Sequence, residues 1–585
     1  MILYNAQIFA RQVGWKLGIL FIMMLGAAIA EGFGVSMILP LLQSDISESD
    51  DILSKIIVGL FDRLGLFPSG TNILILLVVF FILRGGLLIG QAWFQAIILS
   101  DHLMNMRSEL IKLVLNAKYT HITQYPSGYL TNAVVGESRN VGDGLRSLID
   151  LIVALITASV YLALPIMLQP TVTVLLIVLA IPIGIMTAFL IRSTKSASIE
   201  LTRGHGKQES SLVEGFRYSK FVKSTGRVTT MVNRLTEVAS QVSSSYRKML
   251  ILGSLTRYAP EPLVVFVMAG IILVYTRVYN EPITEIMFLM FLFYQATKNI
   301  LRTQSSLRTF VETSGGLLVH QNLRENLSKN TVKSQVENPD PDIESDIHLK
   351  GVSLFYDGET TPALNKVDIQ IPHSKTVAVV GASGSGKTSV ANIISGLIEP
   401  SEGMVMIGGQ PYQSINLNTL QQNIGYVTQE SAVFNGTLAE NISFWDEHPN
   451  HNKIRALLDK VELNFDADDA NTILYRKVGG DGAQLSGGER QRLSIARELY
   501  RESKILILDE ATSALDSNLE QKIDELIKNE RGNRTFLIIA HRLSTVRNAD
   551  NIYVLDKGEV VEEGPFDTLM KKNRLFANMV KRQSF

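Results

Sequence analysis

Six runs of mainly apolar residues, each long enough to cross a membrane, lie in roughly the first 300 residues of this 585-residue chain. A spanning helix needs roughly 20 such residues, and inside lipid a single segment satisfies its backbone hydrogen bonds only as a helix. The runs are Leu17–Leu42, Ile73–Leu99, Leu148–Leu168, Thr171–Ile191, Gly253–Thr276 and Ile283–Leu301. Because no small-residue cleavage site follows the first run, we expect a retained anchor rather than a signal peptide. The sequence therefore predicts an all-α transmembrane domain of six helices over residues 1–325.

The distribution of charge selects an orientation in the membrane. An even number of spans places both termini on one side, and an excess of Lys and Arg marks the cytoplasmic side. The segment Lys195–Lys248 carries ten Lys and Arg residues, whereas the loop between the first two runs is mostly acidic. We therefore expect both termini to be cytoplasmic. The links 100–147 and 192–252 are long and polar, and their turns at Tyr119–Tyr129 and Val213–Gly226 are candidates for contacting a nucleotide domain; the alternative is that they are only long loops.

Several charged residues fall within or at the ends of the apolar runs, where a charge is costly, and four of them are candidates for a functional site. They are Glu31, Arg84, Arg257 and Arg302. One interpretation is an aqueous cavity whose arginines bind an anionic substrate such as a phosphate or diphosphate, to which the planar guanidinium is suited. The alternative is structural, with Glu31 paired to Arg84 and with Arg257 and Arg302 reaching the inner interface. For Arg84, which lies in mid-span, the sequence favours the cavity interpretation, while for Arg257 and Arg302 both interpretations stay open.

The stretch Ile52–Phe67 between the first two runs has apolar residues at helical spacing. It is too short and too charged to span a membrane. The pattern predicts an amphipathic helix at the outer interface, and an ordinary packed loop helix is the alternative.

A polar segment rich in acidic residues and proline, residues 326–345, is predicted to be a linker to a second domain over 346–585. In that domain an apolar strand, Thr376–Val380, is followed by the glycine-rich loop Gly381–Thr388 and a helix. This strand–loop–helix arrangement is what a phosphate-binding loop requires, because backbone N–H groups and the helix N-terminus bind phosphate oxygens. Lys387 is expected to reach the β and γ phosphates, and the Thr388 hydroxyl to bind Mg²⁺.

Two further strands end in residues suited to phosphate chemistry. The strand Ile505–Leu508 leads into Asp509 and Glu510, and the strand Thr535–Ala540 leads into His541. One carboxylate at a strand end can hold Mg²⁺, while a second beside it can orient or deprotonate an attacking water. An isolated histidine at such a position is more often a packing residue.

The segment Leu485–Glu489, which reads Leu-Ser-Gly-Gly-Glu, resembles the signature motif of ATP-binding cassette proteins. The phosphate loop, Gln429, Asp509–Glu510, Ser513–Asp516 and His541 stand with it in the order of that family. The whole chain, six spans followed by one cassette, resembles a half-transporter of the type IV exporter fold. The resemblance implies a multi-domain protein in which an α/β P-loop cassette follows an all-α membrane domain and hydrolyses ATP with Mg²⁺.

The resemblance also assigns roles to individual residues. It implies that Glu510 is the catalytic base, that Gln429 senses Mg²⁺ and the attacking water, and that His541 is the switch histidine. Tyr356 matches the aromatic residue that stacks on adenine. The residues expected at ATP are Tyr356, Gly381, Ser383, Gly384, Ser385, Gly386, Lys387, Thr388, Ser389, Ser486, Gly488 and Asp516, and those expected at Mg²⁺ are Thr388, Gln429 and Asp509. Because Ser486 and Gly488 match groups that bind the ATP of a partner cassette, a dimer is implied. With Glu510 and the signature both intact, a homodimer is the simple interpretation, and a heterodimer with a degraded second chain is the alternative.

The membrane half is similar to bacterial flippases of lipid-linked oligosaccharides in Glu31, Arg84, Arg257, Arg302 and the external amphipathic stretch. This similarity implies transport of an amphipathic, anionic lipid-linked oligosaccharide from the cytoplasmic to the outer leaflet of the bacterial inner membrane. The alternative is a multidrug, peptide or lipid exporter of the same fold. Lys and Arg (55) nearly balance Asp and Glu (56), so no basic field favours a nucleic-acid partner. The chain has no cysteine, which excludes disulfides, thiol catalysis and cysteine-ligated metal.

Overall fold

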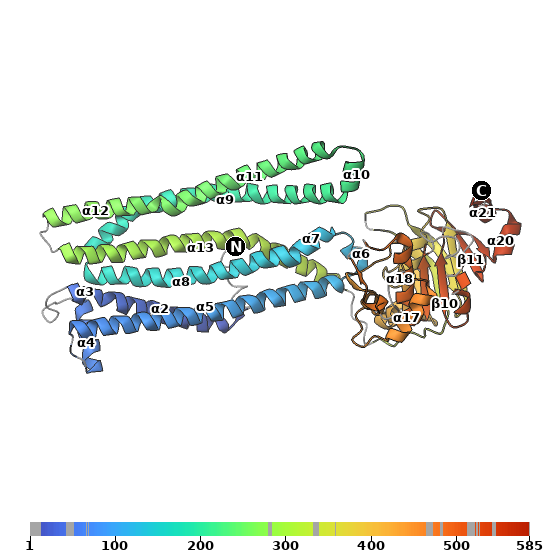
Figure 1. Ribbon diagram of the computed structural model, residues 1–585, viewed down its shortest axis with the longest axis horizontal. Helices are drawn as coiled ribbons and strands as arrows, with labels where there is room; N and C mark the ends of the chain where they lie inside the picture. Colours follow the sequence, from blue (N-terminus) through green and yellow to red (C-terminus); the bar gives the residue numbers. More distant parts are fainter. Residues whose placement is uncertain are drawn as a thin grey trace. The chain divides into compact units, whose positions relative to one another are not determined.

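The computed structural model of the chain contains two units, shown as ribbons in Figure 1. A helical unit comprises Met1–Leu115 and Tyr125–Lys329, and a cassette unit comprises Asn116–Gln124 and Asn330–Phe585. The structure describes residues 13–42, 52–65, 67, 69–278, 283–331, 338–356, 358–463, 472–479, 484–511, 521, 524–525, 527–540 and 546–583.

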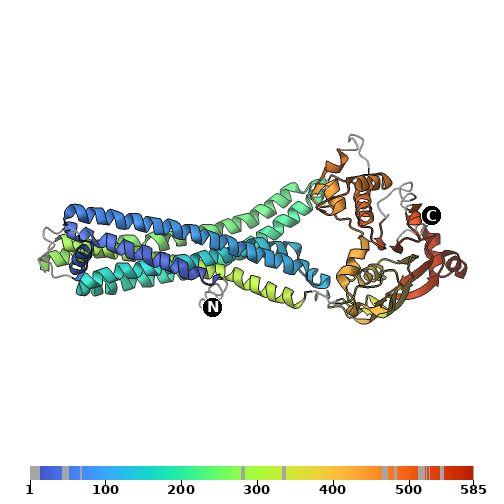
Figure 2. The same cartoon turned by 90° about the horizontal axis from the view of Figure 1, so that it is seen from below.

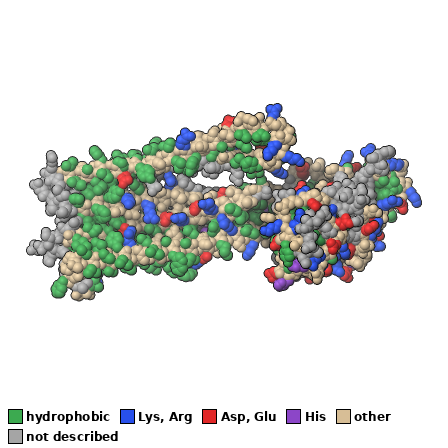
Figure 3. Space-filling model, viewed as in Figure 1, with side chains coloured by type: hydrophobic (Ala, Val, Ile, Leu, Met, Phe, Trp, Pro, Cys, Tyr) green, Lys and Arg blue, Asp and Glu red, His purple; other side chains and the backbone are tan. Residues whose placement is uncertain are grey.

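Each of the six predicted apolar runs lies on helix in the helical unit. Its long helices, which run alongside one another in Figures 1 and 2, are α2 (Lys16–Ser36), α5 (Gly70–Leu115), α8 (Ser138–Leu168), α9 (Pro170–Arg217), α11 (Val228–Tyr258), α12 (Pro260–Val278) and α13 (Ile283–Lys329). Among the described residues, four stretches are long and apolar enough to cross a membrane: Lys16–Leu41, Gly70–Leu115, Gly128–Leu168 and Val228–Leu273. The predicted spans Thr171–Ile191 and Ile283–Leu301 are not among these four, so the count of six spans stays a prediction. Many of their large apolar side chains are exposed, as lipid contact requires, and they cover much of the helical unit in Figure 3.

The short elements of this unit follow the predicted pattern closely. Helix α3 (Ile38–Leu42) follows α2, and α4 (Ile52–Leu64) forms the predicted amphipathic helix. Phe61 of α4 is fully buried against Met37 and Ile73, so this helix is packed onto the bundle. Only Gln169 separates α8 from α9, and Pro170 opens α9, where its fixed φ suits the first helical position.

Helix α13 continues further than the sequence predicted. Residues 326–329, expected to belong to the linker, form its last turn. Glu325 and Lys329 pair at 2.7 Å with i,i+4 spacing, and a lysine near a helix C-terminus is favoured by the helix dipole. The interdomain segment therefore begins after Lys329.

Short helices occupy both turns that were predicted to face a nucleotide domain. Helix α6 (Tyr119–Ile122) belongs to the cassette unit, where Lys118 donates its backbone N–H to Asn330 and pairs with Glu399 at 3.2 Å. Helix α7 (Ser127–Asn132) and the π-helical turn η1 (Ala133–Glu137) lead from it into α8. Helix α10 (Ser219–Ser224) joins α9 to α11 in the helical unit.

The cassette unit is built on two sheets. The larger has the order β12-β11-β3-β10-β9-β6 and is parallel except for β12, while the smaller is antiparallel with the order β2-β1-β4-β5. The strands are β1 (Ile347–Leu354), β2 (Leu364–Ile371), β3 (Thr376–Gly381), β4 (Glu402–Ile407), β5 (Gln410–Pro411), β6 (Ile424–Val427), β9 (Ile505–Asp509), β10 (Thr535–Ile539), β11 (Asn551–Asp556) and β12 (Glu559–Gly564), with β7 (Gly436–Thr437) and β8 (Lys477–Val478) as a separate pair.

Helices cover the larger sheet and complete two apolar cores. They are α14 (Lys387–Ile394), α15 (Leu417–Asn423), α16 (Leu438–Ser443), α17 (His451–Lys460), α18 (Gly487–Tyr500), α20 (Phe566–Lys572) and α21 (Leu575–Gln583). Strand β10 pairs with β3 on one side and β9 on the other, with Ile539 opposite both Val379 and Asp509. The carboxyl ends of β3 and β9 therefore meet at one edge, where ligands bind in open parallel sheets.

Candidate ATP site

The phosphate loop joins β3 to α14 in a conformation that needs its glycines. Gly384 and Gly386 have φ angles of 78° and 101°, which L side chains rarely adopt. A Cβ on Gly386 would lie 2.6 Å from the Ala363 carbonyl oxygen, and one on Gly381 would lie 2.2 Å from that of Leu555. The loop therefore leaves its backbone amides free of side-chain bulk, which fits a cradle for phosphate oxygens.

Lys387 is held inside this loop. Its Nζ donates to the backbone carbonyls of Gly381 and Ala382 at 3.0 and 2.8 Å, and the residue is 5% exposed. Burial lowers the pKa of the Lys387 ammonium, and the nearby carboxylates of Glu510 and Asp509 act against this. The ammonium is thus poised next to the phosphate cradle, bound to carbonyls that a phosphate oxygen can replace.

Asp509 and Thr388 come together at the end of β9. Burial of the Asp509 carboxyl raises its pKa, whereas hydrogen bonds from the Thr388 and Tyr426 hydroxyls lower it. The hydroxyl of Tyr426 lies 3.4 Å from Oδ2 of Asp509 and 3.2 Å from Oδ1 of Asn392 on α14. A hydroxyl and a carboxylate beside a phosphate cradle are the oxygen ligands that Mg²⁺ prefers, so these residues fit the ion.

Glu510 meets Gln429 as the predicted chemistry requires. Gln429 Nε2 donates to Oε2 of Glu510 at 2.7 Å, which joins residues 81 positions apart. Glu510 has a φ of 52°, and its backbone N–H donates to the Ile539 carbonyl at 3.0 Å. Its own carbonyl accepts a hydrogen bond from Gln491 Nε2 at 2.9 Å. The structure therefore brings Lys387, Thr388, Gln429, Asp509 and Glu510 to one site.

Tyr356 lies near the same site, just beyond β1. Its hydroxyl is 3.0 Å from the Ser389 hydroxyl on α14, and the residue is 38% exposed. The half-open ring next to the phosphate loop is available for stacking on a planar base.

The signature segment forms the start of α18. Ser486 caps the helix: its hydroxyl accepts from the Glu489 backbone N–H, and Glu489 Oε2 accepts from the Ser486 backbone N–H at 2.6 Å. Ser486 is exposed. The N-terminus of α18 therefore presents backbone N–H groups and a positive dipole end at the surface, which suits an anionic ligand.

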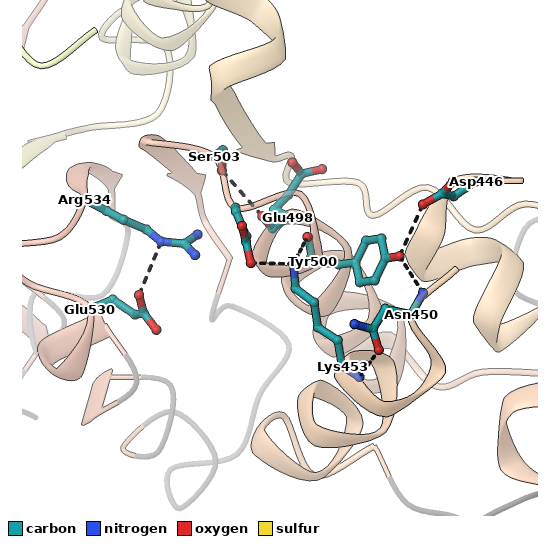
Figure 4. A network of polar contacts seen from close by, with 9 residues as sticks. Asp446, Asn450, Lys453, Glu498, Tyr500, Ser503, Glu530 and Arg534 are labelled. Carbon is teal, nitrogen blue, oxygen red and sulfur yellow. Dashed lines mark hydrogen bonds and ion pairs between the residues drawn. The ribbon is translucent and has the colours of Figure 1, made fainter. Parts of the chain in front are cut away.

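The rest of α18 is fixed by polar contacts to its neighbours. Arg497 Nε donates to the Asn441 carbonyl at 2.8 Å, and its Nη1 donates to the Ala432 carbonyl at 3.0 Å. At the C-terminal end, Lys453 of α17 donates to the Tyr500 carbonyl at 2.7 Å, as Figure 4 shows. These contacts make α18 a firm support for the residues along it.

Three predicted site residues have no described side-chain position. His541 and Asp516 lie outside the described residues, and so does the side chain of Arg257. The remaining predicted ATP-site residues, Ser383, Gly384, Ser385 and Gly488, lie in the phosphate loop or in the first turn of α18. Their roles toward ATP stay predictions.

The charged residues of the membrane runs pair with one another. Arg84 Nη2 lies 2.9 Å from Oε1 of Glu31, and the hydroxyl of Tyr161 donates to the same oxygen at 2.7 Å. Three helices, α2, α5 and α8, thus share one polar contact. Arg302 lies 3.9 Å from Asp150 in a more exposed pair. For Arg84 the structural interpretation is the one that this geometry favours.

Sequence reasoning did not find Gln491, Tyr426 or Tyr161. Gln491 was passed over because it stands inside an amphipathic helix, and Tyr161 because it stands inside an apolar run. The signal that could have found Tyr161 is a polar hydroxyl within a membrane run that contains few other polar groups.

Comparison with known proteins agrees with these observations. Residues 17–297 match a family described as the ABC transporter transmembrane region, and residues 364–513 match one described as ABC transporter. The ATP-dependent lipid A-core flippase of Mannheimia succiniciproducens is 27% identical over 518 residues, 87% of this chain and 88% of the relative. That of Ralstonia nicotianae is 27% identical over 557 residues, 92% of each chain.

A third relative, the heterocyst differentiation ATP-binding protein HepA of a Nostoc species, is 26% identical over 80% of this chain and 77% of its own. A solved structure of a bacterial Atm1-family ABC exporter with ATP bound aligns with 98% of this chain and 99% of that chain, with a TM-score of 0.76 and 21% identity. This structural likeness shows the fold. The two matched regions show that the chain contains both an ABC transporter transmembrane region and an ABC transporter nucleotide-binding domain. The chain therefore belongs to the ABC transporters, as an integral membrane ABC exporter that couples ATP hydrolysis to transport.

Proposed function

We propose that the chain works as a homodimer that moves an amphipathic, anionic lipid-linked glycan, such as a lipid-linked oligosaccharide, from the cytoplasmic to the outer leaflet of the bacterial inner membrane. The observation that carries this proposal is that relatives matching about nine-tenths of the chain are named ATP-dependent lipid A-core flippases. The cassette and both termini are cytoplasmic in this proposal, as the basic links between the spans suggest.

The geometry of the cassette supports a separate role for each of its site residues in ATP hydrolysis. Glu510 acts as the base on an attacking water that Gln429 helps to orient, since their side chains already meet at 2.7 Å. Lys387 and the loop amides bind the phosphates, and Tyr356 stacks on adenine. Thr388, Asp509 and Gln429 would hold Mg²⁺, which neutralises charge on the phosphates. His541 contacts the γ-phosphate and Asp516 lies at the bound ATP, in keeping with the family resemblance.

The exchange of Glu510 for Gln tests the base assignment. The amide is nearly the same size as the carboxylate but does not accept the water proton. We expect ATP hydrolysis to be almost abolished while nucleotide binding persists. Near-normal turnover of the purified variant would refute the assignment.

Exposed apolar side chains on both units support the dimer. At the tip of the helical unit around α10, Phe216, Tyr218 and Phe221 are 69%, 52% and 67% exposed. On the cassette unit, Phe444 and Trp445 are 55% and 48% exposed and stack edge-on with Phe434. Exposed aromatic clusters mark protein contacts. We therefore assign the α10 tip of one copy to the aromatic cluster of the other copy's cassette.

A cysteine pair tests this contact cleanly, because the natural chain has no cysteine. Phe221→Cys and Trp445→Cys in one chain should give a covalent dimer on oxidation, seen as a doubling of mass in a denaturing gel. Each single variant is the matched control. Oxidation that leaves only monomer, or links the two cysteines within one chain, would contradict the proposed contact.

A multidrug, peptide or lipid exporter of the same fold is the second candidate, and one observation favours it. Arg84 is already neutralised by Glu31, which lowers the number of cations free to bind an anionic head group. Substrate-stimulated ATPase in liposomes separates the two candidates. Stimulation by polyprenyl-diphosphate glycans or lipid A-type glycolipids, and not by phospholipids or hydrophobic dyes, supports the glycan proposal; the reverse pattern supports the second candidate.

A further inference from the structure

The backbone of Glu510 is held in an unusual conformation. Its φ of 52° lies in the left-handed region, which a residue with a Cβ adopts at a cost in free energy. Asp509 before it still belongs to strand β9, so the chain turns sharply at this one residue. Non-glycine residues keep such a conformation only where their surroundings enforce it.

Two hydrogen bonds enforce it here, one on each side of the residue. The N–H of Glu510 donates to the Ile539 carbonyl of β10 at 3.0 Å, and the Glu510 carbonyl accepts from Gln491 Nε2 at 2.9 Å. The first is a bond between neighbouring strand ends. The second comes from a side chain on α18, 19 positions away in the sequence.

Gln491 is well placed to act as a fixed donor. The residue is 3% exposed, so its amide is shielded from competing water. Helix α18 is itself anchored by Arg497 to Asn441 and by Lys453 to the Tyr500 carbonyl (Figure 4). A side chain on such an anchored helix loses little entropy when it forms this bond.

The conformation of the backbone decides where the carboxylate lies. The direction of the Cα–Cβ bond follows from φ and ψ, and in the left-handed conformation Oε2 of Glu510 meets Gln429 Nε2 at 2.7 Å. A return of Glu510 to extended backbone would turn its side chain toward another face of the sheet edge, because successive strand residues alternate in direction.

We propose that Gln491 is a positioning residue for ATP hydrolysis: its amide holds the Glu510 peptide in the left-handed conformation and so aims the carboxylate at the attacking water. This inference rests on the proposed role of Glu510 as the base. Helix α18 would then have two functions: it presents Ser486 at its N-terminus, and through Gln491 it positions Glu510 of its own chain.

Gln491→Met tests the proposal, since methionine keeps the length of the side chain but donates no hydrogen bond. In the full-length protein in liposomes, we expect kcat for ATP to fall about 10- to 100-fold, with KM and nucleotide binding within about twofold of the natural protein. Gln421→Met is the matched control, because Gln421 Nε2 also donates to a backbone carbonyl, that of Gly396, at 3.4 Å. Its kcat should change less than twofold. Gln491→Glu, which presents an acceptor to the carbonyl, should behave like Gln491→Met and serves if the methionine variant does not fold.

The double variant Gln491→Met with Glu510→Gln separates positioning from general damage. If Gln491 acts through the Glu510 carboxylate, the residual rate of Glu510→Gln should not fall further, so the two effects are not additive. Two results would overturn the positioning role alone. One is that Gln491→Met lowers the residual rate of Glu510→Gln by the same factor by which it lowers kcat in the natural protein. The other is that Gln491→Met leaves kcat unchanged while Glu510→Gln is inactive. Near-normal turnover of Glu510→Gln would instead remove the role of Glu510 and the inference with it.

Discussion

Replacing Arg84 with alanine distinguishes the two interpretations of the charges in the membrane runs. Arg84 Nη2 and Glu31 Oε1 are 2.9 Å apart, and at an effective dielectric of about 20 two unit charges at this separation attract by about 6 kcal/mol before desolvation is counted. Breaking a buried pair by removing one partner costs roughly 3–5 kcal/mol, because the other charge is left uncompensated. The side chains are 30% and 13% exposed, so we expect the lower end of this range.

A loss of about 3 kcal/mol corresponds to a fall in Tm of roughly 4–5 °C for a unit as large as the helical one. The measurement is thermal unfolding of the purified full-length protein in detergent, together with ATPase and transport in liposomes. The variant that removes both charges, Arg84→Gln with Glu31→Gln, should recover most of the loss, because no charge is then stranded. Arg302→Ala is the control, since its contact with Asp150 is 3.9 Å long and exposed, and its Tm should change little.

The structural interpretation predicts that Arg84→Ala lowers ATPase and transport together, in proportion to the loss of folded protein. An Arg84→Ala protein with an unchanged Tm and normal basal ATPase, but with transport lost, would refute it. Arg84 would then bind the substrate, as the cavity interpretation holds. The double variant Arg84→Gln with Glu31→Gln is an independent test. If Arg84 binds substrate, transport stays lost in the double variant, because removing Glu31 does not restore the substrate contact.

Other predictions concern the cassette and the external helix. Gly386→Ala should weaken ATP binding at least 10-fold and lower the Tm, since its Cβ would lie 2.6 Å from the Ala363 carbonyl at a φ of 101°; equilibrium nucleotide binding measures this. Burial raises the folded pKa of Asp509 above its unfolded value, so stability is lost as the pH rises from the unfolded pKa through the folded pKa, and the full cost is present above it. Asp509→Asn should therefore raise the Tm at high pH, leave it unchanged at low pH and abolish Mg²⁺-dependent hydrolysis. Phe61→Ala should destabilise the helical unit by roughly 3 kcal/mol, whereas the exposed Leu64→Ala should change its Tm little.

The sequence was sufficient to predict those elements whose defining residues lie close together along the chain. The phosphate loop needs strand, glycines, lysine and helix within a dozen residues, and each of these physical requirements can be read along the chain. The membrane runs are also local signals, since length and apolarity decide whether a helix can cross lipid, and four of the six predicted runs overlap stretches of the described residues that meet both conditions. The end of α13 was misplaced by four residues, because a polar helical turn that ends on a Glu325–Lys329 pair resembles a linker in composition.

The contacts that complete the sites were not predictable from the sequence. Tyr161 and Glu31 are 130 positions apart, and Gln429 and Glu510 are 81 apart. Whether such residues meet depends on the packing of helices and on strand register. The pairing of Glu31 with Arg84 was one of two interpretations of these charges. Whether the two side chains meet depends on which face of each helix they occupy once the helices pack together, and the sequence alone does not give this packing.

The two bonds to the Glu510 peptide have a consequence for how ATP hydrolysis is controlled. One bond comes from β10, the strand that leads into the predicted switch histidine at 541, and the other comes from α18, the helix that begins at Ser486. A left-handed backbone at a non-glycine residue is costly, so it relaxes when either support moves. In the proposed dimer, Ser486 would bind the nucleotide of the second copy at the N-terminus of this same helix. We therefore expect hydrolysis in one copy to depend on the nucleotide held by the other, through the 2.9 Å hydrogen bond that Gln491 of α18 donates to the Glu510 carbonyl.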